Sequence, residues 1–140
     1  GVMSGLLSMI NFSIDSVKKG ELKVIESFDG YQGEWANVIK GMNQIINIFN
    51  EKIDTIGVFL GKISKGDIPG KITEDYPGKF NEIKRHINQE ITVMNDLIQE
   101  LNKLMIEARR GNLKSRGNIA GFEGSWKGLI EGINSLLDSF

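Results

Sequence analysis

The chain has 140 residues, a formal net charge of −1 and 25% charged side chains. This balance gives no electrostatic reason to expect nucleic acid or an anionic membrane surface as a partner. The absence of cysteine excludes disulfides and thiolate metal sites. No run of 18 or more apolar residues occurs, so we expect no direct membrane insertion by this segment.

The first predicted element is an amphipathic helix that ends at Gly20. Apolar residues before this glycine recur at intervals of 3, 4 and 3 residues, from Leu7 to Val17, which is a heptad seam along a helix. Lys18 and Lys19 suit the negative end of a helix dipole, and glycine suits the left-handed position just beyond a helix. A connector of about a dozen residues follows and leads to a second helix near Gly33.

Two long helices are predicted next, near residues 33–65 and 77–110. The heptad seam that starts at Trp35 continues without a break through Ile63, so one helix joins neighbouring segments. Gly57 and Gly61 should each cost about 1 kcal/mol of helix propensity relative to alanine, and they mark its weakest stretch. Before the second long helix, Asp75 precedes Tyr76-Pro77 and is the expected N-cap. A third connector and a last helix complete the chain.

These elements repeat. The first glycines of the three connectors are separated by 46 and 45 residues, and an asparagine follows ten residues after each second glycine. These asparagines either fix register as buried polar residues or bond a connector, and the sequence favours neither. The three repeats are residues 3–48, 49–94 and 95–140. Their first glycines, second glycines and asparagines are Gly20, Gly66 and Gly111; Gly33, Gly78 and Gly124; and Asn43, Asn88 and Asn134.

The direction and partner of each helix follow from the loop and the seam. An extended loop of a dozen residues spans roughly 40 Å, which is enough to return along a helix of 15 residues, so the two helices of a repeat can be parallel. Two helices make a thin core, whereas two chains side by side make a four-helix bundle. We therefore predict an all-α protein that forms a parallel homodimer of four-helix coiled coils.

The repeat resembles a HAMP domain. The connectors start with "GEL", "GDI" and "GNL", and "DYPG" at residues 75–78 matches an acidic-x-x-Gly motif that "GYQG" and "GFEG" keep only in part. The whole chain is similar to tandem HAMP regions of bacterial methyl-accepting chemotaxis proteins and sensor histidine kinases. The resemblance implies a signal relay to a downstream signalling domain of the same chain, in the cytoplasmic portion of an inner-membrane receptor.

The candidate functional residues fall into three groups. The resemblance implies that the connectors pack through Gly20, Leu22, Ile25, Gly66, Ile68, Ile72, Gly111, Leu113 and Ile119. The starts of the second helices are expected at Gly33, Trp35, Asp75, Gly78, Phe80, Gly124 and Trp126. The bundle core predicted from the seams is Leu7, Ile10, Ile14, Met42, Ile46, Ile53, Ile56, Leu60, Ile87, Ile91, Ile98, Leu101, Met105, Ile133 and Leu137.

No enzyme is predicted. The chain shows no repeated pair of carboxylates on one helix face and no nucleophile motif, and its single histidine, His86, lacks the acidic-Pro context of a phospho-acceptor helix. We expect no catalytic residue, cofactor or metal site. The predicted function is a relay in which adjacent repeats prefer opposite packings. The alternatives are a passive coiled-coil spacer and a helical bundle that binds a ligand in its apolar interior.

Overall fold

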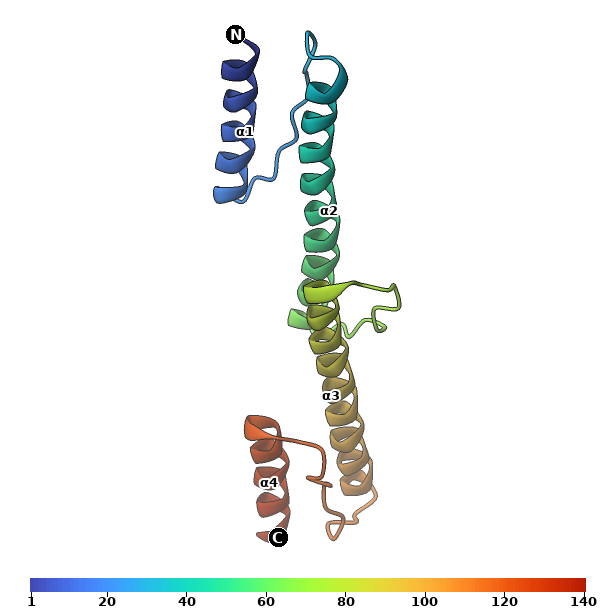
Figure 1. The fold of residues 1–140 in the computed structure, drawn as a ribbon. Coiled ribbons are helices and arrows are strands. Elements are labelled where there is room, and N and C mark those ends of the chain that lie inside the picture. The colour runs from blue at the N-terminus through green and yellow to red at the C-terminus, as the bar shows by residue number, and fades with distance from the viewer. The chain divides into compact units, whose positions relative to one another are not determined.

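The computed structural model describes all 140 residues and contains four helices and no strands (Figure 1). They are α1 (Val2–Lys18), α2 (Gly33–Ser64), α3 (Gly78–Arg109) and α4 (Gly124–Asp138). The all-α prediction is confirmed, and each long helix ends within one residue of its predicted boundaries. The chain divides into two compact units, Gly1–Gly61 and Lys62–Phe140, and each is described by itself.

The first three helices end in the same way. The backbone N–H of Gly20 donates to the carbonyl of Val17, and that of Glu21 donates to the carbonyl of Ser16. This pair of bonds is the Schellman motif, in which a left-handed residue satisfies the last carbonyls of a helix. The same two bonds occur at Gly66 and Gly111, and the three glycines have φ angles of 73°, 79° and 82°. Glycine is required there because other residues are strained at positive φ.

The second glycines begin the later helices, but the expected N-cap at Asp75 is wrong. α3 begins at Gly78, its N-cap position is Pro77, and no side chain caps it with a hydrogen bond. Gly78 itself has a φ of 53°, so the chain enters the helix through a backbone turn that only glycine adopts readily. Asp75 lies one residue too far from the helix to reach its first amides as an N-cap side chain does.

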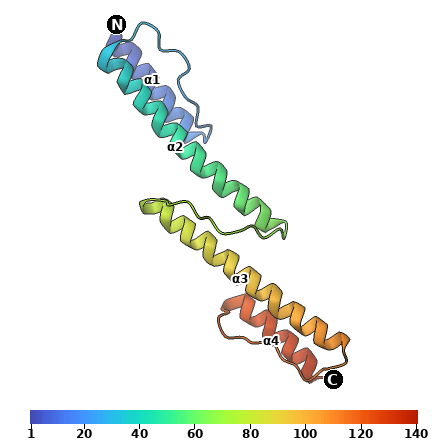
Figure 2. The same ribbon diagram turned by 90° about the vertical axis from the view of Figure 1, so that its right-hand side faces the viewer.

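In the first unit, α1 and α2 run in the same direction, and the connector returns along them (Figures 1 and 2). This arrangement confirms the parallel geometry predicted from the length of the loop. Leu6 of α1, Ile25 of the connector and Ile39 of α2 form the buried core. The connector is therefore part of the packing and not a free loop.

In the second unit, α3 and α4 are also parallel in both views (Figures 1 and 2). Leu97 of α3, Phe122 of the third connector and Ile130 of α4 form its buried core, with Val93 and Leu101 packed against it. Helix, connector and helix thus contribute one buried residue each, as they do in the first unit.

The helix-to-helix contact within a chain lies one step away from the predicted seam. Leu6 and Leu97 stand fourteen residues before the first glycines, and Ile39 and Ile130 stand six residues after the second glycines. All four are at most 6% exposed. None of them was predicted as core. The two units therefore use equivalent residues at equivalent positions.

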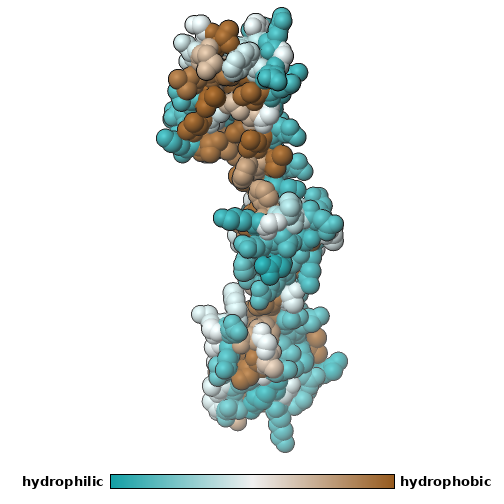
Figure 3. Space-filling model, in the orientation of Figure 1, coloured by the Kyte–Doolittle hydropathy of each residue, from teal (hydrophilic) through white to brown (hydrophobic).

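Many predicted core residues are exposed in the single chain. Ile46, Ile87 and Ile91 are buried as predicted. Six are between 41% and 58% exposed: Leu7, Ile14, Ile53, Leu60, Ile98 and Met105. The remaining six are partly buried: Ile10, Met42, Ile56, Leu101, Ile133 and Leu137. Figure 3 shows the hydrophobic band that such residues form over α1 and α2. Burial of the six exposed residues in a dimer stays a prediction.

Candidate functional site

The candidate site is the place where each connector is fastened to the helix that follows it. The side-chain carbonyl of Asn43 in α2 accepts the N–H of Ile25 at 2.8 Å, and its amide group donates to the Ile25 carbonyl at 2.8 Å. Asn88 in α3 makes the same pair of bonds to Ile72, at 2.8 and 3.0 Å. One asparagine thereby satisfies both backbone groups of one connector residue.

The third connector is held by the same device. Asn134 of α4 accepts the N–H of Gly117 at 2.7 Å and donates to the Gly117 carbonyl at 3.0 Å. We call the three pairs of bonds the asparagine clamps. They decide between the two roles that the sequence left open, because all three asparagines bond a connector. Each clamp fixes the height of a connector along its helix and so couples the two.

The first connector has two further fastenings. The Lys23 N–H donates to Oγ of Ser16 at 2.6 Å, and the Asn50 side chain donates to the carbonyl of Leu22 at 2.9 Å. Ser16 lies on α1 and Asn50 on α2, so this connector is tied to both helices of its repeat. Leu22 has a φ of 52°, which is uncommon for a residue other than glycine.

Gly117 takes the place that the resemblance gave to Ile119. Ile119 is 37% exposed, whereas Gly117 is buried and clamped. The prediction of Ile119 as a connector anchor is therefore wrong. A Cβ atom on Gly117 would lie 2.6 Å from Cγ2 of Ile130 and 3.2 Å from Cδ1 of Leu104. The third connector approaches its helices too closely for a side chain, so glycine replaces the isoleucine of the other two clamps.

Charged side chains add to the third connector. The Glu100 carboxylate of α3 accepts the N–H of Asn118 at 3.0 Å and pairs with Lys103 at 3.0 Å. The hydrogen bond from Asn118, and then the Lys103 ammonium, lower the pKa of Glu100. On the other side, the Arg116 guanidinium donates through Nε to Asp138 of α4 at 2.9 Å. These bonds join the third connector to both helices of its unit.

The other predicted connector residues differ in burial. Ile25 and Ile72 are 8% and 5% exposed, as expected of residues that pin a connector. Leu22 and Ile68 are half-buried. Leu113 is 40% exposed, so its predicted packing is absent within the single chain. Near the helix starts, Phe80 is half-buried, whereas Trp35 and Trp126 are 43% and 38% exposed.

The sequence analysis missed an aromatic residue that stands two positions before each second glycine. These residues are Tyr31, Tyr76 and Phe122. Tyr76 and Phe122 are buried, and the Tyr31 hydroxyl occupies the space where a side chain on Gly5 would lie. The signal was visible in "GYQG", "DYPG" and "GFEG", but those stretches were compared only for their acidic residue and their glycines.

The arrangement offers binding and positioning rather than chemistry. His86 lies exposed on α3. No group of three or more His, Asp or Glu side chains is placed to hold a metal ion. None of the four helices has the length and hydropathy needed to cross a membrane.

Comparison with known families gives one match. A family model described as the HAMP domain matches residues 30–96, which include the end of the first connector, α2, the second connector and the first half of α3. No solved structure matches the chain. HAMP domains are non-catalytic signal-relay modules in the cytoplasmic part of bacterial receptors. The match to residues 30–96 therefore supports a HAMP domain in this part of the chain, with the second asparagine clamp inside it.

Proposed function

We propose that the chain relays conformational change through three tandem HAMP units, residues 3–48, 49–94 and 95–140, in a parallel homodimer. The change passes from each bundle to the next through α2 and α3, and from the last unit to a downstream signalling domain that controls a kinase. The host is a methyl-accepting chemotaxis protein or a sensor histidine kinase. The observation that carries this proposal is the asparagine clamp, which occurs at equivalent positions in all three repeats.

The clamps matter because they couple connector and helix. If an asparagine moves with its helix, the clamped connector residue must move with it or lose two hydrogen bonds at a cost of about 1 kcal/mol each. Tilt or rotation of the second helix therefore shifts the connector, and the connector leads back to the end of the first helix. Such coupling is what a two-state bundle needs in order to change as one body.

The exposed seam supports the dimer. In α1 and α2, Ile14, Val17 and Val38 are 42% to 50% exposed, and they line one apolar groove with Ile10, Met42 and Ile46. A monomer seldom leaves a contiguous apolar surface of this kind open to water. A second copy placed in parallel would bring the same residues together across a two-fold axis and complete a four-helix bundle.

A passive spacer is the weaker alternative. A rod that only separates two domains needs continuous helices, and it gains nothing from connectors that are clamped at fixed heights. In this chain the connectors carry ten hydrogen bonds that involve named side chains, among them the six bonds of the clamps. That investment favours a device that moves as one body over an inert link.

Cysteine cross-linking tests the proposed dimer. The chain has no cysteine, so single substitutions give unambiguous disulfides. Ile98 on the seam of α3 is 41% exposed, and Asp96 lies two positions away on the same helix, at roughly 160° around its axis. We expect Ile98→Cys to form a disulfide between copies under mild oxidation and Asp96→Cys to stay largely monomeric. Equal yields, or a monomer mass by light scattering, would reject the proposed dimer.

A further inference from the structure

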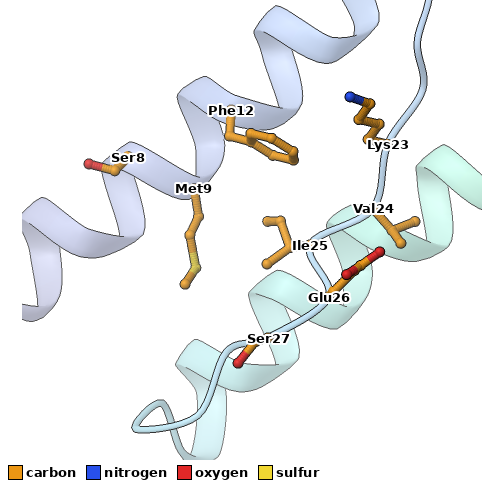
Figure 4. A pocket seen from close by; sticks show the side chains of 8 residues that line it. All are labelled: Ser8, Met9, Phe12, Lys23, Val24, Ile25, Glu26 and Ser27. Carbon is orange, nitrogen blue, oxygen red and sulfur yellow. The ribbon is translucent and has the colours of Figure 1, made fainter.

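The first unit contains a cavity that the relay does not use. It has a volume of about 580 Å³ and lies between α1 and residues 23–27 of the first connector (Figure 4). This volume falls in the range of about 300–1,000 Å³ that small-molecule sites occupy. Met9 and Phe12 of α1 point toward Ile25 of the connector, so the cavity has an apolar centre (Figure 4).

The cavity faces away from the proposed dimer seam. Phe12 is 46% exposed and lines the cavity, whereas Ile14 lines the seam groove. Two residues apart on a helix, they point in directions separated by roughly 160°. A second copy seated on the seam therefore leaves the cavity open.

The third unit shows what belongs in this position. Glu100 stands eleven residues before Gly111, as Met9 stands eleven residues before Gly20. Asn118 follows the clamped Gly117, as Glu26 follows the clamped Ile25. In the third unit the Glu100 carboxylate accepts the Asn118 N–H at 3.0 Å.

The first unit lacks that carboxylate. Met9 offers only a weakly accepting sulfur, and the N–H of Glu26 makes no hydrogen bond within the chain. An acceptor from outside the chain would satisfy this donor. Lys23 lines the same cavity and supplies a positive charge, although it also pairs with Glu21 at 3.0 Å. The Glu26 side chain lines the cavity too and adds one negative charge at its edge.

We propose that this cavity binds a small organic monocarboxylate with an apolar body. The carboxylate accepts the Glu26 N–H, as Glu100 accepts the Asn118 N–H in the third unit, and it lies near the Lys23 ammonium. The apolar body packs between Met9, Phe12 and Ile25. This inference goes beyond the proposed relay, because it needs only the first unit and stands whether or not the chain transmits a signal.

Titration of the 140-residue chain with octanoate, followed by amide NMR, tests the site. We expect saturable shifts that are largest at the Glu26 amide. Met9→Glu supplies the missing carboxylate from the chain itself and should weaken octanoate binding at least tenfold. Phe12→Ala changes an exposed side chain, keeps the fold, and should weaken binding about threefold to tenfold by removing apolar contact. Helicity of each variant is checked by circular dichroism.

Two charge variants complete the design. Lys23→Gln should weaken binding about threefold to fivefold, in line with an exposed charge pair. Lys18→Gln is the matched control, because Lys18 lines the seam groove instead, and it should leave the affinity unchanged. Absence of a saturable shift at Glu26, or shifts confined to the seam residues Ile10 and Met42, would overturn the proposal. Equal weakening by both charge variants would overturn it as well.

Discussion

Replacement of Asn88 by alanine is the sharpest test of the asparagine clamps. The wild-type side chain makes two hydrogen bonds to Ile72, at 2.8 and 3.0 Å. Ile72 is only 5% exposed, so water does not readily replace these partners. Two net hydrogen bonds at about 1 kcal/mol each, plus the cost of poorly solvated backbone groups, give a loss of about 2–3 kcal/mol.

The assay combines thermal unfolding with amide hydrogen exchange at one fixed protein concentration, since an oligomer's stability depends on concentration. We expect the melting temperature to fall by about 5–10 °C and the Ile72 amide to lose its protection. Asn88→Asp should keep the bond from the Ile72 N–H while it loses the donor to the Ile72 carbonyl, so the amide stays protected.

Asn102→Ala is the matched control, because Asn102 lies exposed on the same helix. It should change the melting temperature by no more than about 2 °C. If Asn88→Ala unfolds like this control and the Ile72 amide stays protected, the clamp contributes nothing and the reasoning fails.

Two further predictions concern the third connector. Gly117→Ala should destabilise the chain by about 1–3 kcal/mol in thermal melts, because its Cβ would lie 2.6 Å from Ile130; Gly128→Ala in open space on α4 should instead gain about 0.5–1 kcal/mol, and equal effects would contradict the packing. Since the folded state lowers the pKa of Glu100, its contribution is complete above the ordinary pKa of about 4.3 and is lost as pH falls through the lower, folded value. Glu100→Gln should therefore lower stability by about 0.5–1.5 kcal/mol at pH 7 and by less at pH 3, and a pH-independent effect would contradict this linkage.

The helix boundaries could be predicted because glycine and heptad spacing punctuate the sequence strongly. Gly20, Gly66 and Gly111 end helices through backbone conformations that other residues adopt poorly. Gly33, Gly78 and Gly124 begin the next helices in the same register. Parallel helices followed from the length of the connectors. These features depend on local backbone preference, which a single sequence carries.

The phase of the core could not be predicted as well. Leu6 and Leu7 are adjacent, as are Ile45 and Ile46, so the apolar stripe is wide enough for two seams. The heptad rule selected Leu7, whereas the contact within the chain uses Leu6, which is 6% exposed. One apolar stripe serves the partner helix of the same chain, and its neighbour is left for another surface.

The third connector shows a second limit. A search for an apolar anchor selects Ile119 and passes over Gly117, because glycine carries no hydrophobic signal. The clamp acts on the backbone of Gly117, and the closeness of Ile130 decides that no side chain fits there. Such a contact depends on the distance between connector and helix, which spacing in the sequence does not give.

The central claim is that helix phase in one repeat sets the packing of the next. Insertion of two residues after Asn50 in α2 changes the phase downstream, whereas insertion of seven keeps it. In the Ile98→Cys background, we predict that the two-residue insertion shifts disulfide formation away from residue 98 on α3 and that the seven-residue insertion preserves it. Unchanged cross-linking with both insertions would contradict the relay.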